Sequence, residues 1–199
     1  MKTKSNSQKK KQNKIVIGFV GKICSGKGVA AAYLQKKYRA DSAMFSTSMR
    51  DILDRLYLPQ SRENLQKISL LLRDNFGSDI FSKTMVSDIA KGKKQFVVID
   101  GFRRVEDVLS FRSLPSFTLI HMTAPEKVRY ERLRARKQNP GDAKVTWEQF
   151  RIQDNAETEK TIAKAAKQAD IHIDNSLSLK DLYKKLDEVV TKAKKKRSS

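Results

Sequence analysis

The segment GKICSGKG, residues 21–28, has the residue types and spacing to bind phosphate groups. Gly21 and Gly26 let the backbone bend towards phosphate oxygens, and the amides around Ser25 would point into the loop at a helix N-terminus, where the helix dipole favours anions. Lys27 has the position to reach the β- and γ-phosphates of a nucleotide and is assigned a catalytic role. The predicted phosphate-binding residues are Gly21, Lys22, Ile23, Cys24, Ser25, Gly26, Lys27, Gly28 and Val29.

The segments on either side of this loop support the assignment. Residues 15–20 (IVIGFV) are apolar and β-branched, which predicts a buried strand, and residues 29–38 (VAAAYLQKKY) have helix formers at helical spacing. A strand, a glycine loop and a helix in this order match the G-x-x-x-x-G-K core of a P-loop. One position departs from the motif, because Gly28 replaces the Ser or Thr that ordinarily ligates Mg²⁺ after the lysine. The sequence leaves open how Mg²⁺ is held.

Asp100 is the predicted metal-binding and catalytic carboxylate. It ends the apolar run QFVVID, residues 95–100, and ligands of α/β proteins bind at the carboxyl ends of strands. It would hold Mg²⁺ directly or through water, in a reaction that relies on positioning and charge stabilisation. The alternative is that Asp100 caps a turn or a helix.

Several arginines have the chemistry to bind phosphate, because the guanidinium group pairs with phosphate oxygens in a bidentate way. Arg129, Arg132 and Arg136 follow i, i+3, i+7 spacing and are predicted to share one helix face, on which Arg132 and Arg136 are assigned catalytic roles. The alternative is a solvated face that pairs with nearby glutamates. The predicted substrate-binding residues are Arg50, Arg73, Arg103 and Arg104.

Ion pairs compete with these roles. Arg73 has Asp74 and Asp79 nearby in sequence, and Arg103 and Arg104 precede two acidic residues. Arg151 is predicted to form a salt bridge with Asp154. Cys24, the only cysteine, excludes an intramolecular disulfide, and it is interpreted as a small residue that fits the loop rather than as a redox centre. His121 and His172 lie in apolar runs and are interpreted as core or rim residues.

Alternating strands and helices predict a parallel sheet with right-handed crossovers. The expected strands are 15–20, 43–46, 95–100, 116–122 and 170–173, and the expected helical stretches are 29–38, 48–91, 104–112, 125–138, 146–168 and 178–195. The stretch at 48–91 and the charged region at 126–168 are interpreted as additions to this core.

Five segments, the phosphate loop among them, resemble nucleoside monophosphate kinases and their relatives. GKG followed by a helix resembles the P-loop of these kinases, and residues 98–104 (VIDGFRR) resemble the strand end of adenylate kinases. Phe45-Ser46 with Met49-Arg50 resembles the start of the acceptor-binding helices, and the arginines of 129–136 resemble an arginine-bearing lid. Residues 169–175 (ADIHIDN) resemble the final strand of dephospho-CoA kinase-like and archaeal adenylate kinase-like proteins.

The expected fold is therefore a P-loop NTPase three-layer α/β/α sandwich, spanning residues 15–191. Its core would comprise 15–43, 92–125 and 169–191, with an acceptor-binding region at 44–91 and a lid at 126–168. The resemblance implies a kinase that uses ATP and Mg²⁺ to phosphorylate a small phosphorylated acceptor, a nucleoside monophosphate or dephospho-CoA. The alternatives are a P-loop NTPase without a small acceptor and a nucleic-acid-binding protein that works through its basic tails.

The net charge of +20 is concentrated at the two ends of the 199-residue chain. Residues 1–14 hold six lysines and 192–199 hold five basic residues, without acids. Both segments are expected to be disordered tails, with either a loose contact to nucleic acid or another polyanion, or a solubilising role alone. No apolar run approaches the ~20 residues of a membrane helix, so no membrane partner and a cytoplasmic location are expected.

Overall fold

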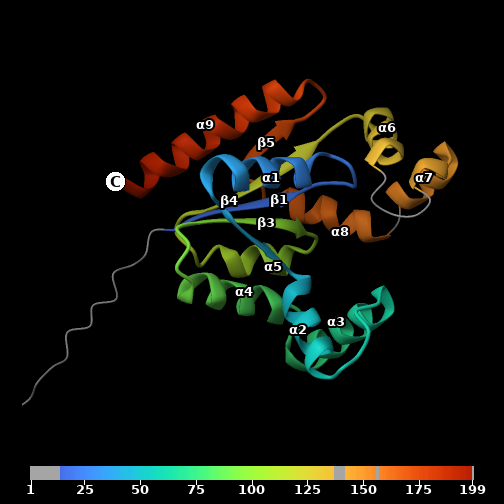
Figure 1. Ribbon diagram of the computed structural model, residues 1–199, viewed down its shortest axis with the longest axis vertical. Helices are drawn as coiled ribbons and strands as arrows, with labels where there is room; N and C mark the ends of the chain where they lie inside the picture. The colour runs from blue at the N-terminus through green and yellow to red at the C-terminus, as the bar shows by residue number, and fades with distance from the viewer. Residues whose placement is uncertain (1–13, 137–141, 156, 199) are drawn as a thin grey trace, which may run out of the picture.

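A computed structural model describes residues 14–136, 142–155 and 157–198. Five strands form one parallel sheet in the order β2-β3-β1-β4-β5. The strands are β1 (Ile15–Val20), β2 (Asp41–Met44), β3 (Phe96–Phe102), β4 (Phe117–Thr123) and β5 (Ile171–Asp174). All six residues of the central β1 are buried, as expected of an apolar, β-branched strand between two neighbours. In Figure 1 the strands begin on the left of the molecule and end on the right.

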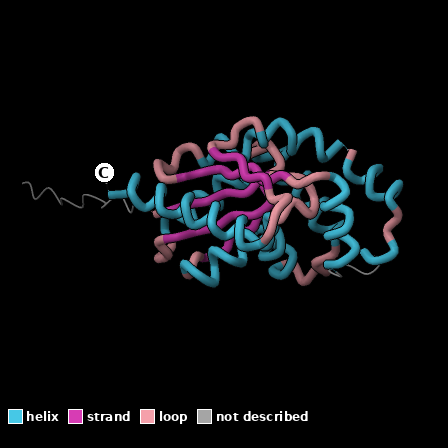
Figure 2. Tube along the Cα trace, turned by 90° about the horizontal axis from the view of Figure 1, so that it is seen from above, coloured by secondary structure: helices cyan, strands magenta, loops and turns pink. Residues whose placement is uncertain are grey.

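Helices cover both faces of this sheet (Figures 1 and 2). The helices are α1 (Lys27–Tyr38), α2 (Ser46–Arg55), α3 (Arg62–Phe76), α4 (Ile80–Lys91), α5 (Val105–Phe111), α6 (Glu126–Arg136), α7 (Trp147–Asp154), α8 (Glu157–Ala166) and α9 (Leu179–Ser198), with a 3₁₀ turn at Asp142–Lys144. Residues of α1 and α9 pack with one face of the sheet, and residues of α4, α5 and α8 pack with the other. This is the predicted three-layer α/β/α fold of P-loop proteins.

Two of the predicted additions contribute to the core. Met85 and Ile89 of α4 are buried against the sheet, although residues 44–91 were expected to form the acceptor-binding region. Ile162 and Ala165 of α8 are buried in the same layer, although residues 126–168 were expected to form the lid. The proposed acceptor-binding and lid regions therefore shrink to α2–α3 and α6–α7. The apolar side of each helix explains the difference, because burying it requires contact with the sheet.

The expectation of basic, disordered tails is wrong for Lys14 and for residues 192–198. The Lys14 side chain is buried, and its ammonium donates to backbone carbonyls of Ile89, Ala90 and Gly92. Residues 192–198 continue α9 to Ser198. Lysine is a good helix former, and cations near a helix C-terminus interact favourably with the helix dipole. Residues 1–13 lie outside the described part of the chain.

Candidate functional site

The GKICSGKG loop joins the end of β1 to the start of α1, as predicted. The backbone geometry requires glycine at its first two glycine positions. Gly21 has a φ of 150° and Gly26 a φ of 105°, in a region that side-chain-bearing residues rarely adopt. A Cβ at Gly21 would also collide with the backbone carbonyl of Met122, and a Cβ at Gly26 with the side-chain amide of Asn175. Two neighbouring elements thus press on the loop and fix its path.

Side chains hold the loop from inside and outside. The buried Asn175, which follows β5, donates from Nδ2 to the carbonyl of Ser25 at 2.9 Å. The Lys27 ammonium lies within the loop, where it donates to the carbonyls of Gly21 at 2.7 Å and Lys22 at 3.0 Å. The loop is therefore shaped before any ligand arrives, with a positive charge at its centre and the N-terminus of α1 behind it.

Asp154, at the end of α7, connects the proposed lid to the loop. Its carboxylate accepts from Lys22 Nζ at 2.8 Å and from Arg129 Nη2 at 2.9 Å, and both Asp154 and Arg129 are buried. Burial alone would raise the pKa of Asp154, but the hydrogen bonds from Arg129 and Lys22 hold that pKa below its usual value. Arg129 also donates to the carbonyl of Ala124 at 3.1 Å.

These contacts correct one prediction. Asp154 does not pair with Arg151, whose guanidinium lies 3.5 Å from the Glu126 carboxylate instead. The partner of Asp154 comes from α6 because Asp154 points back towards the loop. Sequence reasoning therefore missed Asp154 as part of the site.

Asp100 lies near the end of β3, where its register partner in the central strand is Phe19. Burial raises the pKa of this carboxyl group, against the opposing effects of Lys27, the Gly101 backbone amide and Arg103. Its Oδ1 is buried and accepts no hydrogen bond from any described residue. An unpartnered carboxylate oxygen beside a phosphate loop suits a hard cation such as Mg²⁺, so the residues present fit this metal. Gly28 and Val29 supply no side-chain oxygen.

The arginines of α6 make three separate contacts instead of presenting one shared face. Arg129 holds Asp154, as described. Arg132 donates from Nη2 to the carbonyl of Asn175 at 2.8 Å, and Arg136 donates from Nε to Asp142 at 2.9 Å. Arg132 Nη1 is buried and has no hydrogen-bond partner within the described ranges. Arg132 therefore stays close to the loop, because Asn175 also holds Ser25.

Burial raises the pKa of the Cys24 thiol, although Arg136 and Lys27 oppose this shift. A raised pKa keeps the sulfur protonated and poorly nucleophilic. This agrees with the interpretation of Cys24 as a small residue that fits the loop.

The structure does not bring all predicted substrate-binding arginines to the loop. Arg50 on α2 donates to Gln60 Oε1 at 2.6 Å, and Gln60 in turn donates to Asp54. Arg73 at the end of α3 is largely buried, 3.4 Å from Asp107 and stacked over the Phe81 ring. These contacts give Arg73 a structural role that accounts for it without a substrate. The side chains of Arg103 and Arg104 are exposed just after β3.

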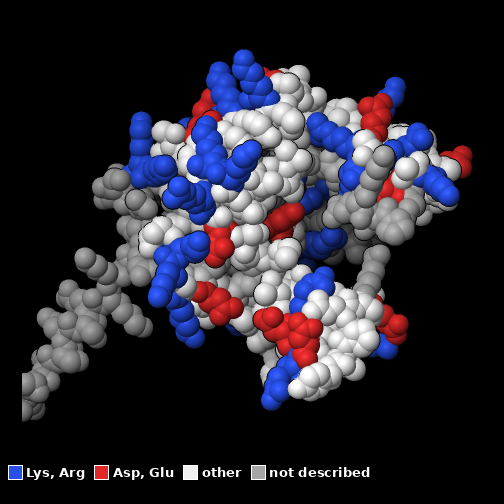
Figure 3. Space-filling model, in the orientation of Figure 1, with Lys and Arg blue, Asp and Glu red and all other residues white. Residues whose placement is uncertain are grey.

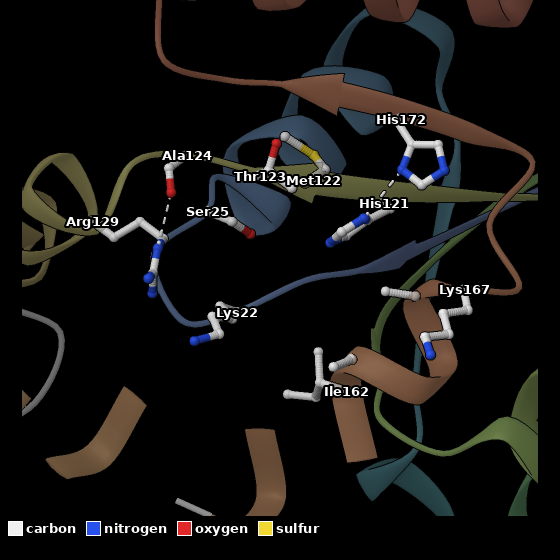
Figure 4. A pocket seen from close by; sticks show the side chains of 12 residues that line it. Lys22, Ser25, His121, Met122, Thr123, Ala124, Arg129, Ile162, Lys167 and His172 are labelled. Carbon is white, nitrogen blue, oxygen red and sulfur yellow. Dashed lines mark hydrogen bonds between the residues drawn. The ribbon is translucent and has the colours of Figure 1, made fainter. Parts of the chain in front are cut away.

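A cavity of about 460 Å³ opens beside the loop, between α8 and the β4–β5 edge of the sheet (Figure 4). His121 and His172 face each other in it, because the two residues are register partners on adjacent strands, and their Nδ1 atoms are 3.2 Å apart. Burial and the neighbouring His172 lower the pKa of His121. The sequence assigned both histidines to the core or rim, and only the strand register pairs them.

Within residues 14–136, 142–155 and 157–198, His, Cys, Asp and Glu side chains form no group of three or more that could hold a metal ion. None of the helices in the described ranges is long and apolar enough to span a membrane.

Comparisons with known proteins agree with this architecture. A UPF0200 protein of Hyperthermus butylicus is 28% identical over 169 residues, which cover 85% of this chain and 89% of that protein. A UPF0200 protein of Pyrococcus horikoshii is 29% identical over 184 residues, which cover 89% and 97% respectively. The shikimate kinase of Bacteroides thetaiotaomicron superposes with a TM-score of 0.60 at 13% identity, covering 89% of this chain and 98% of that one.

At 13% identity, the shikimate kinase shows a shared fold of the P-loop kinase type and nothing more specific. The nucleoside monophosphate kinase and dephospho-CoA kinase families are not identified by these comparisons. Residues 17–162, from β1 to the middle of α8, match the family described as an AAA domain. That match covers the phosphate loop, Asp100, the α6 arginines and Asp154. Because it extends over more than half of the sequence, this chain belongs to the AAA-domain family.

Proposed function

We propose that this protein is an ATP-dependent phosphotransferase that acts on a small phosphorylated acceptor, a nucleoside monophosphate or dephospho-CoA. One observation carries the proposal. In the described part of the chain, three buried side-chain polar atoms have no hydrogen-bond partner: Ser25 Oγ, Asp100 Oδ1 and Arg132 Nη1. Buried polar groups are ordinarily paired, so unpaired ones point to partners that arrive with a ligand. All three belong to residues that the sequence motifs assign to the site.

These residues divide the work of binding the donor. The loop amides and the α1 dipole would bind the phosphates, and Lys27 would exchange the carbonyls of Gly21 and Lys22 for phosphate oxygens. Asp100 would hold Mg²⁺, which when bound offsets phosphate charge. Arg132, which donates to Asn175 beside the loop, would direct its second amino group at the transferring charge.

The ties between lid and loop favour transfer over hydrolysis. Lys22 and Arg129 share Asp154, so α6, α7 and the loop are held together. Water excluded from such a site cannot compete with the acceptor for the phosphoryl group. Arg50, on α2, is the proposed acceptor ligand, and binding would require it to leave Gln60.

A screen for acceptor-stimulated ADP release tests the proposal. The full chain is incubated with ATP and Mg²⁺, and ADP is measured with nucleoside monophosphates, deoxynucleoside monophosphates, dephospho-CoA or shikimate, and without an acceptor. We expect at least one phosphorylated acceptor to raise the rate well above the acceptor-free rate. Equal rates with and without every acceptor would favour the NTPase alternative. Stimulation by shikimate alone would move the acceptor to an unphosphorylated class.

The Lys27→Ala variant is the control for contaminating enzymes in the screen. Lys36→Ala, on the exposed side of the same helix, is its matched partner. Activity that survives Lys27→Ala does not come from the proposed site.

A further inference from the structure

The end of the molecule opposite the phosphate loop gathers lysines from three separate segments. We call this surface the basic end and define it by exposed residues at the end of α1, at and just after the end of α4, and in the last turns of α9. They are Lys36, Lys37, Arg39, Lys91, Lys93, Lys94, Lys192, Lys194 and Lys195. Figure 3 shows Lys and Arg spread over α9, α1 and the left edge of the molecule, where Figure 1 places the beginnings of the strands.

Contacts within the fold bring these segments together. Lys194 lies over the ring of Tyr38 at 5.1 Å, and Lys37 lies 2.7 Å from the Asp187 carboxylate, so the ends of α1 and α9 are adjacent. Lys14 donates to the carbonyl of Gly92, and Ile15 pairs with Gln95, so the segment after α4 meets the start of β1.

We propose that the basic end binds the phosphate backbone of double-stranded nucleic acid. Lysines act as point charges for phosphates, and they suit binding that neutralises a backbone without reading bases. Lys192, Lys194 and Lys195 lie in the last turns of α9, and Lys194 lies against Tyr38 at the end of α1, so cations from two helices share one surface. Cations held close together by the fold can meet several phosphates of a duplex at once.

Two features favour a duplex over other polyanions. Single-strand binders stack bases on exposed aromatic rings, whereas Tyr33 and Tyr38 are half-buried and their hydroxyls donate to Asp187. Membrane-surface helices insert large apolar side chains, and among the described residues none of the exposed large apolar side chains lies in 36–39, 91–94 or 192–195. In its described residues, the basic end therefore offers exposed positive charge without exposed aromatic or large apolar side chains, as duplex backbone binding requires.

The position of the basic end also separates this activity from phosphoryl transfer. The phosphate loop follows β1 at the opposite end of the strands, and α1 and α9 each run from that end towards the basic end (Figure 1). Nucleic acid bound here would leave the nucleotide site open. The inference therefore does not depend on the identity of the acceptor.

Salt-dependent binding tests this proposal. Fluorescence anisotropy of a labelled 20-base-pair DNA duplex is measured with the full chain from low to moderate salt. The test variant is Lys192→Gln/Lys194→Gln/Lys195→Gln, and the control is Lys67→Gln/Lys83→Gln/Lys180→Gln, which removes the same charge from exposed sites on α3, α4 and the start of α9. The melting temperature of each variant checks its fold.

We expect the test variant to weaken binding and to reduce the slope of log binding constant against log salt by about 2 to 3, since each phosphate contact contributes about 0.9. The control should keep the wild-type slope, and ATP turnover should be unchanged in the test variant. Equal effects of both variants would overturn the basic end in favour of net charge alone. Absence of duplex binding, or tighter binding to vesicles of anionic lipid or to single strands, would also overturn the proposal.

Discussion

The phosphate loop and the α2–α3 segment differ in how far the fold prepares them for a ligand. The loop is held by buried partners on two sides, Asn175 after β5 and Asp154 at the end of α7. The α2–α3 segment instead exposes large apolar side chains, with Tyr57 88% and Phe76 66% exposed. Arg50, its proposed ligand for the acceptor, is held by an exposed hydrogen bond to Gln60.

This difference predicts that the protein loses less conformational entropy when a ligand binds the loop than when one binds α2–α3. A preformed loop loses little conformational entropy when phosphates bind, whereas Arg50 must first give up its exposed bond to Gln60 and then be ordered by its ligand. Donor binding should therefore depend on single buried contacts in the loop. Acceptor binding should depend on a contact that forms only when Arg50 moves.

Lys27→Ala should have the largest effect, because it changes the preformed phosphate loop. The lysine supplies the central charge of the loop, so we expect ATP turnover to fall below detection. Its side chain is not fully buried, and the melting temperature should stay near that of the wild type. Steady-state ADP release measures the change, with Lys36→Ala as the control. Turnover within threefold of the wild type would contradict the phosphate-loop assignment.

Arg132→Ala should lower turnover by about 10³-fold or more, the range of an arginine that stabilises transferring phosphate charge. The effect on ATP binding should be much smaller, since the charge that Arg132 would stabilise develops only as the phosphoryl group is transferred. Arg136→Ala should show the same division between rate and binding. The exposed Arg134→Ala on the same helix serves as the control. Equal losses in ATP binding and rate would place Arg132 in donor binding instead.

Asp154→Ala should destabilise the folded protein by about 3–5 kcal/mol, because it leaves the buried Arg129 charge without its partner. Urea unfolding measures this loss. Glu126→Gln breaks the ion pair with Arg151, in which both side chains are more exposed than in the Arg129–Asp154 pair, and should cost less than about 1 kcal/mol. If both variants lose a similar free energy of unfolding, the contacts of Asp154 stabilise the protein no more than an exposed ion pair does.

Arg50→Ala should affect binding of the acceptor at α2, not binding of ATP at the loop. We expect the acceptor KM to rise about 10- to 100-fold, the loss of a charged hydrogen bond of about 1.5–3 kcal/mol, with little change in the KM for ATP. Steady-state kinetics with both substrates measure the split, and the exposed Arg55→Ala on α2 is the control. A rise in the KM for ATP alone would place the acceptor site elsewhere.

His121→Gln should have the smallest effect, confined to acidic pH. Because the pKa of His121 is lowered in the folded protein, the unfolded chain binds the proton first as pH falls below about 6.5. Wild-type stability should therefore decrease from pH 7 to pH 5.5. The variant should decrease less, as measured by urea unfolding at each pH.

Burial raises the pKa values of Asp100 and Asp107, so these carboxyl groups make the protein more stable as the pH falls, opposite to the effect of His121. Both groups are present in the wild type and in His121→Gln, so their contributions cancel when the two proteins are compared. Identical slopes for the wild type and His121→Gln would contradict the effect of the cavity on His121.

The sequence by itself determined the phosphate loop and the order of strands and helices. These features depend on local chemistry: glycines where φ is positive, an apolar β-branched strand before them and helix formers after them. The parallel sheet follows from that alternation. Positions such as Lys27 and Asp100 were predictable because they lie at fixed places relative to a strand end.

Only the tertiary structure decided the partners of the buried charges and the roles of the additions. Lys22 and Asp154 are separated by 132 residues, and Ser25 and Asn175 by 150, so no sequence periodicity links them. Arg151 offered a nearer partner for Asp154, but a buried carboxylate pairs with the cations that its helix faces. The β4–β5 register likewise paired two histidines, and contact with the sheet turned α4 and α8 into core helices, because long-range packing overrides local patterns.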